Sequence, residues 1–69
     1  MEEFKLETGE FIELHHLLKI MRLCDSGGMA KVAIANGLVK VDGIVELRKS
    51  CKIHKGQIVE YGGHTITVT

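Results

Sequence analysis

The hydrophobic residues of this 69-residue chain first recur with the period of a helix. After Glu13 they fall at i, i+3, i+4 and i+7, which places them in one stripe of an amphipathic helix: Leu14, Leu17, Leu18 and Met21. Glu13 in the first turn and the basic residues Lys19 and Arg22 at the end suit the helix dipole. A helix this short is unstable alone, so the sequence predicts a second helix that packs against the stripe.

A second helical pattern begins at Ser26, whose hydroxyl can accept a hydrogen bond from the free amides of a first helical turn. Asn36 and Gly37 predict the end of this helix, because both tolerate the left-handed conformation that a C-terminal cap requires. The two helices are expected to form a helical hairpin around residues 22–25. The apolar face of the second helix follows at helical spacing: Ala30, Ala33 and Ile34.

The rest of the chain alternates apolar and polar residues, which predicts strands over 38–41, 44–47, 57–61 and 64–68, with a basic extended segment through Ile53. Asp42-Gly43 and Gly62-Gly63 suit two-residue hairpin turns. These turns set the expected cross-strand pairs: Val41 with Ile44, Val39 with Glu46, Tyr61 with His64 and Val59 with Ile66. A short alternation over 4–6, ended by Thr8-Gly9, suits an edge strand. The expected fold class is α+β.

The length of the chain indicates one domain, residues 1–69, with a small core. The chain has no Trp, one Tyr and two Phe, so its packing must come from aliphatic side chains. No apolar run approaches the roughly 20 residues of a membrane span, and the N-terminus lacks a basic segment followed by an apolar stretch. We therefore expect a cytoplasmic protein with no membrane contact, and a monomer.

The net charge of zero hides an asymmetry along the chain. Residues 1–30 carry six acidic and three basic side chains, whereas residues 31–69 carry three acidic and six basic ones. Such a distribution gives a basic patch if the fold gathers the cations on one surface, and an ordinary solvated surface if it does not. The scarcity of aromatic residues disfavours recognition by base stacking and favours recognition of the shape and backbone of folded RNA.

The cysteines and histidines do not form a recognisable metal or catalytic motif. Cys24 and Cys51 have no CxxC partner, so we expect free, partly buried thiols. The adjacent histidines His15 and His16 point about 100° apart on a helix, which suits no shared metal ligand. The segment from Ser26 also lacks the spacing of a phosphate-binding P-loop. We therefore expect no cofactor, no metal and no enzymatic activity.

Gly27 and Gly28, which follow the capping serine, allow two interpretations. Glycine costs a helix up to about 1 kcal/mol relative to alanine. In the first interpretation, the glycines leave the amides of the first turn open, so that a phosphate can approach the positive end of the helix. In the second, they only let a loop pack closely against the helix.

The run S-x-x-x-A-K-x-x-I-x-x-G-x-V-x-V-D-G from Ser26 to Gly43 resembles the S-four RNA-binding domain, also called the alpha-L motif. The resemblance covers residues 12–59, and the chain is similar to short, stand-alone bacterial members of this family. It implies a helical hairpin packed on a small, mostly antiparallel sheet, with structured RNA bound against the helices and adjoining basic strands. The implied RNA-binding residues are Ser26, Gly27, Lys31, Lys40, Arg48, Lys49 and Lys52.

These expectations together describe a non-enzymatic protein that binds structured RNA, ribosomal or tRNA-like, through a basic face. The alternative is a protein–protein interaction module with the same fold. Its discriminating feature is the glutamate-rich N-terminal third, which would contact a protein partner.

Overall fold

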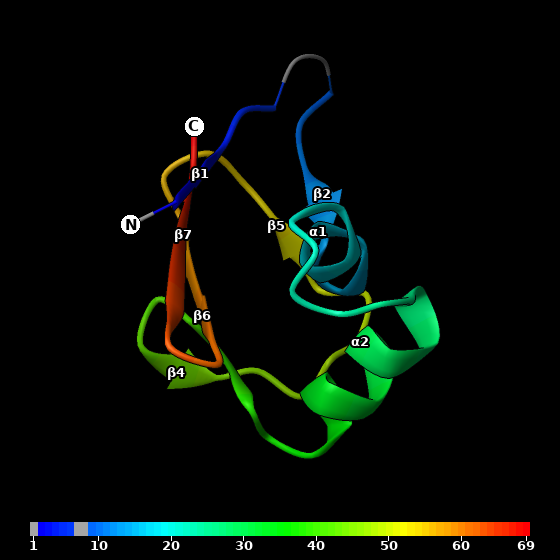
Figure 1. Cartoon of the computed structure of the whole chain (residues 1–69). Helices are drawn as coiled ribbons and strands as arrows, with labels where there is room; N and C mark the ends of the chain where they lie inside the picture. The colour runs from blue at the N-terminus through cyan, green and yellow to red at the C-terminus, as the bar shows by residue number, and fades with distance from the viewer. Residues whose placement is uncertain (1, 7–8) are drawn as a thin grey trace.

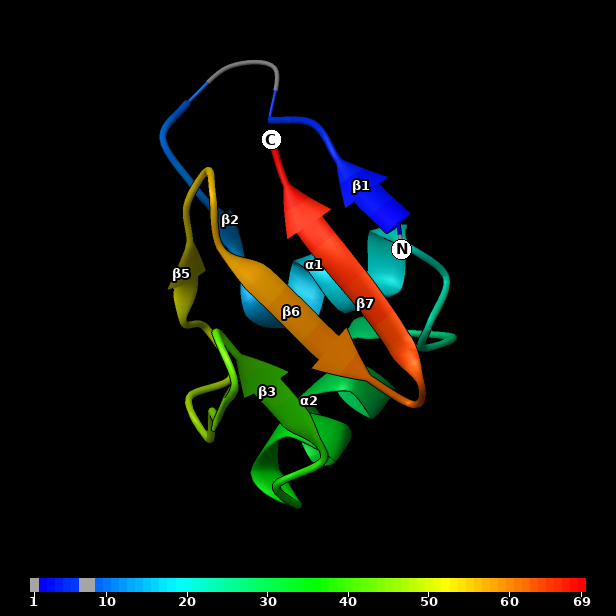
Figure 2. The ribbon, with the colours of Figure 1, turned by 90° about the vertical axis from the view of Figure 1, so that its left-hand side faces the viewer.

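The computed structural model describes residues 2–6 and 9–69, and within them two helices cover one face of a small sheet. Figure 1 shows the sheet edge-on with both helices on the same side of it, and Figure 2 shows the opposite, uncovered face of the sheet. The helices are α1, Leu14–Ile20, and α2, Gly27–Ala35. The expected α+β class and helical hairpin are confirmed.

Helix α1 buries the predicted leucine stripe, because Leu14, Leu17 and Leu18 are all fully inaccessible to solvent. Two details of the prediction were wrong. Glu13 is the extended residue that precedes the helix, so it does not lie in the first turn. Arg22 lies beyond the end of the helix and adopts a positive φ of 60°. Of the two expected basic residues, only Lys19 lies in the last turn, where its charge favours the helix dipole.

Helix α2 follows its prediction closely. The Ser26 hydroxyl oxygen accepts a hydrogen bond of 3.1 Å from the Met29 N–H, which is the expected N-terminal cap. Asn36 ends the helix, and Gly37 continues with a positive φ of 76°, as the left-handed termination requires. The predicted apolar face is buried: Ala30, Ala33 and Ile34.

The main sheet has the strand order β1-β7-β6-β3-β4. Neighbouring strands are antiparallel except β1 and β7, which run parallel. The expectation of a mostly antiparallel sheet is confirmed. The strands are β1 Glu2–Phe4, β3 Val39–Val41, β4 Ile44–Val45, β6 Ile58–Tyr61 and β7 His64–Val68.

The hairpin registers agree with the turn chemistry. Asp42 and Gly43 have φ values of 51° and 82°, as a type I′ turn requires. The Asp42 carboxylate also accepts hydrogen bonds from the Ile58 N–H at 2.9 Å and the Gln57 side-chain amide at 3.1 Å, which lower its pKa. The confirmed pairs are Val41 with Ile44, Tyr61 with His64 and Val59 with Ile66. The Glu46 N–H donates to the Val39 carbonyl oxygen at 3.0 Å, just beyond β4.

The N-terminal strand differs from the prediction. It covers Glu2–Phe4, two residues earlier than expected, and it joins β7 in parallel through a register that places Phe4 beside Val68. The expected break at Thr8 lies outside the described residues, while Gly9 has a φ of 83°. The strand therefore forms one edge of the sheet. It can pair in parallel with β7 because the two strands are far apart in the sequence and are not joined by a tight turn.

A second, two-stranded sheet lies apart from the main one. It pairs β2, Ile12–Glu13, with β5, Lys52–Ile53, in antiparallel register. The sequence did not predict β2, and only two residues of the expected basic segment form a strand. Ile12 and Ile53 lie opposite each other and are buried in the core that the helices and both sheets share.

Three further expectations concern properties of the whole molecule. Cys24 and Cys51 are free thiols, the first buried and the second half-buried, as predicted. Neither described helix is long and apolar enough to cross a membrane. Within residues 2–6 and 9–69, no three histidine, cysteine or acidic side chains come together in a group that could hold a metal ion.

Candidate functional site

The N-terminus of α2 is open to solvent apart from its serine cap. Ser26 satisfies the Met29 N–H, and within the described part of the chain the N–H groups of Gly27 and Gly28 have no hydrogen-bond partner. A Cβ built on Gly27 would lie 3.8 Å from His15 Nδ1, which is ordinary contact. Close packing therefore does not require glycine at position 27, and of the two interpretations the open amides fit the structure better.

The N-terminus of α1 is closed by a loop from the second half of the chain. The Leu14 N–H donates to the Cys51 carbonyl oxygen at 2.9 Å, and the His15 N–H donates to the Lys49 carbonyl oxygen at 3.2 Å. These two bonds hold the backbone of residues 48–51 across the start of the helix. They place Lys49 beside His15, which in turn neighbours Gly27 of the second helix.

Lys31 extends the same region along α2. It is exposed and lies four residues after Gly27, so the two residues occupy one face of the helix. The structure thus brings together a pair of cations, a histidine and open amides from three segments of the chain. We call this the helix-end surface and define it by four residues: His15, Gly27, Lys31 and Lys49.

His15 is a residue that the sequence analysis considered only as a metal ligand and did not include in the candidate site. Its Nε2 lies 2.9 Å from Glu13 Oε1, and its ring stacks on that of His16 with centroids 6.4 Å apart. No sequence signal marks it, since its contact with Gly27 arises only when the two helices pack.

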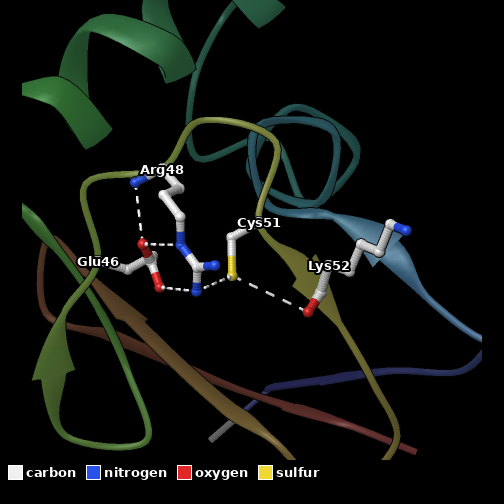
Figure 3. A network of polar contacts seen from close by, with 4 residues as sticks. All are labelled: Glu46, Arg48, Cys51 and Lys52. Atoms are coloured by element: carbon white, nitrogen blue, oxygen red, sulfur yellow. Dashed lines mark hydrogen bonds and ion pairs between the residues drawn. The ribbon is translucent and has the colours of Figure 1, made fainter.

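Arg48, a predicted RNA-binding residue, is engaged by an acidic neighbour (Figure 3). Its Nε and Nη2 donate to the two carboxylate oxygens of Glu46, each at 3.0 Å, and its backbone N–H donates to Oε2 at 2.9 Å. These bonds lower the Glu46 pKa to about 2 and raise the pKa of Arg48. The guanidinium also contacts Cys51 Sγ at 3.7 Å. Arg48 therefore braces the loop, and Glu46 balances its charge.

Burial and the Glu46 carboxylate act together on Cys51. Desolvation is the larger cause and the nearby negative charge the smaller one, and both raise the pKa of the thiol. The thiolate form is disfavoured, which makes this cysteine a poor nucleophile.

Lys52 and Lys40 lie away from the helix-end surface. Figure 3 shows the Lys52 side chain extending toward β2, on the other side of the segment from Arg48. Lys40 is exposed between the buried residues Val39 and Val41, so it projects from the face of the sheet that the helices leave uncovered. Its cross-strand neighbour there is Glu60. The structure therefore does not bring all of the predicted cations onto one face.

Comparison with known proteins identifies the family of this chain. A family model described as the S4 domain, which is the S-four RNA-binding domain, matches residues 4–69. YbcJ from Escherichia coli strain K12 is 50% identical over 68 residues, which cover 99% of this chain and 97% of that protein. YbcJ from Shigella flexneri gives the same identity and coverage.

Two solved structures share the fold. The solution structure of YbcJ from E. coli is 49% identical and has a TM-score of 0.77, over all of this chain and 87% of that chain. It is described as revealing an alpha-L motif involved in RNA binding. The crystal structure of the 30S ribosomal protein S4e from Thermoplasma acidophilum is 27% identical with a TM-score of 0.69. That match covers 84% of this chain and 31% of the ribosomal protein.

Proposed function

Because this chain belongs to the S4 domain family, we propose that it is a non-enzymatic protein that binds structured RNA, ribosomal or tRNA-like, through the helix-end surface. It acts as a cytoplasmic monomer and needs no cofactor. The observation that carries the proposal is the open first turn of α2, where the Gly27 and Gly28 amides lie next to Lys31 and to the loop that carries Lys49.

The chemistry of this surface suits a phosphate backbone. Unpaired N–H groups at the positive end of a helix donate to anionic oxygens, and a residue without a Cβ leaves room for a phosphate to approach. Lys31 and Lys49 are both exposed and add positive charge on either side. Among the other predicted residues, Ser26 holds the helix start and Arg48 holds the loop, so these two position the surface.

The similar proteins support the same chemistry. The E. coli YbcJ structure is described by a motif involved in RNA binding, and the archaeal S4e protein is a ribosomal protein with the same domain fold. The alignment with YbcJ extends along nearly the whole chain, so it covers the segments that build the helix-end surface.

A salt titration with three lysine variants tests the site. The logarithm of the association constant for a structured RNA hairpin should fall linearly with the logarithm of the salt concentration. Lys31→Ala and Lys49→Ala should each reduce the slope by about 0.7 to 0.9, which is the contribution of one phosphate contact. Lys40→Ala is the matched control, because that exposed lysine lies on the uncovered face of the sheet. Equal slopes for the wild type and all three variants would contradict the assignment of the helix-end surface as the binding site. The absence of salt-dependent RNA binding would contradict the proposed function.

Crosslinking to RNA in cells, followed by sequencing, identifies the target. The wild type should enrich one class of structured RNA, and a Lys31→Ala/Lys49→Ala variant should lose that enrichment. Enrichment of ribosomal RNA would support a ribosomal target, whereas enrichment of transfer RNA would support a tRNA-like one.

Exposed apolar side chains favour a second candidate function, a protein–protein contact. They lie on α2 and around the β3–β4 hairpin: Met29, Val32, Leu38, Ile44, Val45 and Leu47. The predicted acidic third is a weaker candidate surface, since Glu2 and Glu13 already pair with His64 and His15. A specific partner that remains bound after ribonuclease treatment would favour this second function.

A further inference from the structure

Phe11, Lys52 and His54 lie together on the solvent face of the small β2–β5 sheet. Ile12 and Ile53 pair across this sheet and are 8% and 0% exposed, so both point into the core. Side chains alternate along a strand, and the residues next to the two isoleucines therefore project outward. Phe11 is 40% exposed, so part of its ring is accessible to solvent.

The three side chains contact one another in a defined arrangement. The Lys52 ammonium lies 4.9 Å from the centroid of the Phe11 ring, and the His54 ring lies 6.2 Å from it at an angle of 58°. The cation over the ring shows that this face of Phe11 is accessible to a polar, charged group. The geometry is that of a cation–π contact flanked by a second ring.

His54 is held in place before any ligand binds. Its Nδ1 lies 2.9 Å from the Glu10 carbonyl oxygen, which can only accept, so Nδ1 carries the proton. Its backbone N–H donates to the Gln57 side-chain oxygen at 2.8 Å. The first bond therefore orients the ring and the second anchors the backbone of His54, while Nε2 is left free of the Glu10 bond.

Two open hollows adjoin these side chains. One of about 500 Å³ borders Lys52 and His54, and a separate one of about 730 Å³ borders Phe11 together with Glu13 and His16. The exposed Phe11 ring, with the cationic Lys52 side chain beside it, suits a ligand that is both anionic and aromatic.

We propose that this surface, the nucleotide platform of Phe11, Lys52 and His54, holds one unpaired nucleotide of the RNA beside a paired stem. The proposal rests on the RNA-binding function above. The base stacks on the Phe11 ring, and the exposed, flexible Lys52 side chain moves from the ring to a phosphate of the same nucleotide. With two Phe, one Tyr and no Trp, the chain has too few aromatic rings to stack several bases. The single accessible ring of Phe11 is enough to stack one base.

A bulged RNA hairpin tests the platform directly. One hairpin carries a single 2-aminopurine bulge, and a second has the same stem fully paired. The wild type should bind the bulged hairpin about fivefold to about 150-fold more tightly, which is the range that stacking of one base provides. The 2-aminopurine fluorescence should fall on binding, because stacking on Phe11 quenches it.

Substitutions at Phe11 separate the platform from the rest of the protein. Phe11→Leu should remove the preference for the bulge and leave the affinity for the paired hairpin unchanged, while Phe11→Tyr should keep the preference. Tyr61→Leu is the control, since Tyr61 is an aromatic residue on β6 that does not line the hollow beside Phe11. A thermal unfolding curve of each variant confirms that it folds.

The outcomes distinguish this proposal from the one on which it rests. Equal binding of the two hairpins by the wild type, without quenching, overturns the platform and leaves RNA binding intact. A bulge preference that survives in Phe11→Leu also overturns it. Binding of neither hairpin overturns both proposals, and displacement of the bulge by free adenosine monophosphate assigns the platform to free nucleotides instead.

Discussion

The two helices begin in opposite ways. The start of α1 is covered, since the Leu14 and His15 amides donate to carbonyl oxygens of the loop at residues 49–51. The start of α2 is uncovered, and among residues 2–6 and 9–69 the Ser26 hydroxyl is the one side chain that satisfies a first-turn amide. The first N–H groups of a helix have no partner within the helix. In α1 they bind a distant segment of the chain, and in α2 they remain available to a ligand.

The residues at the two starts explain the difference. Glu13 precedes α1 without capping it through its side chain, so the amides depend on the loop. Ser26 caps α2 locally, and the glycine that follows adds no Cβ to hinder an approach from solvent. The start of α1 is therefore part of the tertiary structure, whereas the start of α2 is capped locally by Ser26 and keeps the Gly27 and Gly28 amides open.

Truncation of the residue at the covered start has the largest expected effect. Leu14→Ala should lower the free energy of unfolding by about 2–5 kcal/mol, because Leu14 is fully buried and its loss leaves a cavity. Urea unfolding monitored by circular dichroism measures this loss. The control is Ile20→Ala at the exposed end of the same helix, where the change should stay within about 0.5 kcal/mol. Similar losses in both variants would contradict the assignment of the core.

Removal of the cap at the uncovered start should have a smaller effect. Ser26→Ala removes the 3.1 Å bond to the Met29 N–H and should cost about 1 kcal/mol of stability. Ser50→Ala is a suitable control, because Ser50 is an exposed turn residue. If both variants unfold at the wild-type urea concentration, the cap does not stabilise α2.

The loop that covers α1 provides a pH-dependent contribution. The Glu46 pKa falls from its ordinary 4.5 to about 2, chiefly through the Arg48 guanidinium and then through the Arg48 N–H. A carboxyl with a lowered pKa stabilises the fold above its ordinary pKa, and this stabilisation is lost as the pH falls from about 4.5 toward 2. Arg48 is 78% exposed, so solvent screens the ion pair and keeps this contribution small.

Glu46→Gln checks this contribution. Unfolding curves between pH 2 and pH 7 should show a weaker loss of stability at low pH in the variant than in the wild type. Some dependence should remain, because the Asp42 pKa is also lowered. A Glu46→Gln curve with the wild-type pH dependence would contradict the bracing role of the ion pair.

Addition of a single methyl group to the uncovered start should change stability least. Gly27→Ala should leave the unfolding free energy unchanged or raise it by less than about 1 kcal/mol, because alanine favours helices. The same variant should bind structured RNA more weakly, since the new Cβ limits the approach of a phosphate to the open amides. Gly27→Ala should therefore keep or gain stability while it loses RNA affinity. Undiminished RNA affinity would show that these amides do not contact the ligand.

Local features of the fold could be predicted from the sequence because they depend on neighbours along the chain. Ser26 caps α2 through a residue three positions later, and Asp42-Gly43 selects its turn through backbone conformations that favour those residues. The leucine stripe of α1 is set by the same short-range periodicity. Once the turns were fixed, the hairpin registers followed from the period of two along each strand.

The parts that sequence reasoning missed all depend on segments distant in the chain. The β2–β5 pair forms because Ile12 and Ile53 both fill the remaining core, and no local pattern records their partnership. The position of β1 similarly depends on the edge that β7 leaves available. Long-range pairing is set by which surfaces remain unburied after the helices pack, and this is a property of the whole fold.

The candidate site divides along the same line. The sequence by itself determined the cap, the glycine and the lysine of α2, because helical spacing places Ser26, Gly27 and Lys31 within one turn and a half. Only the tertiary structure decided which cations join them. It brings Lys49 next to His15 through a backbone bond, pairs Arg48 with Glu46 and turns Lys40 to the other face of the sheet. The order of charged residues along a chain does not fix which surface they occupy. The position of each helix, strand or loop in the folded protein decides this.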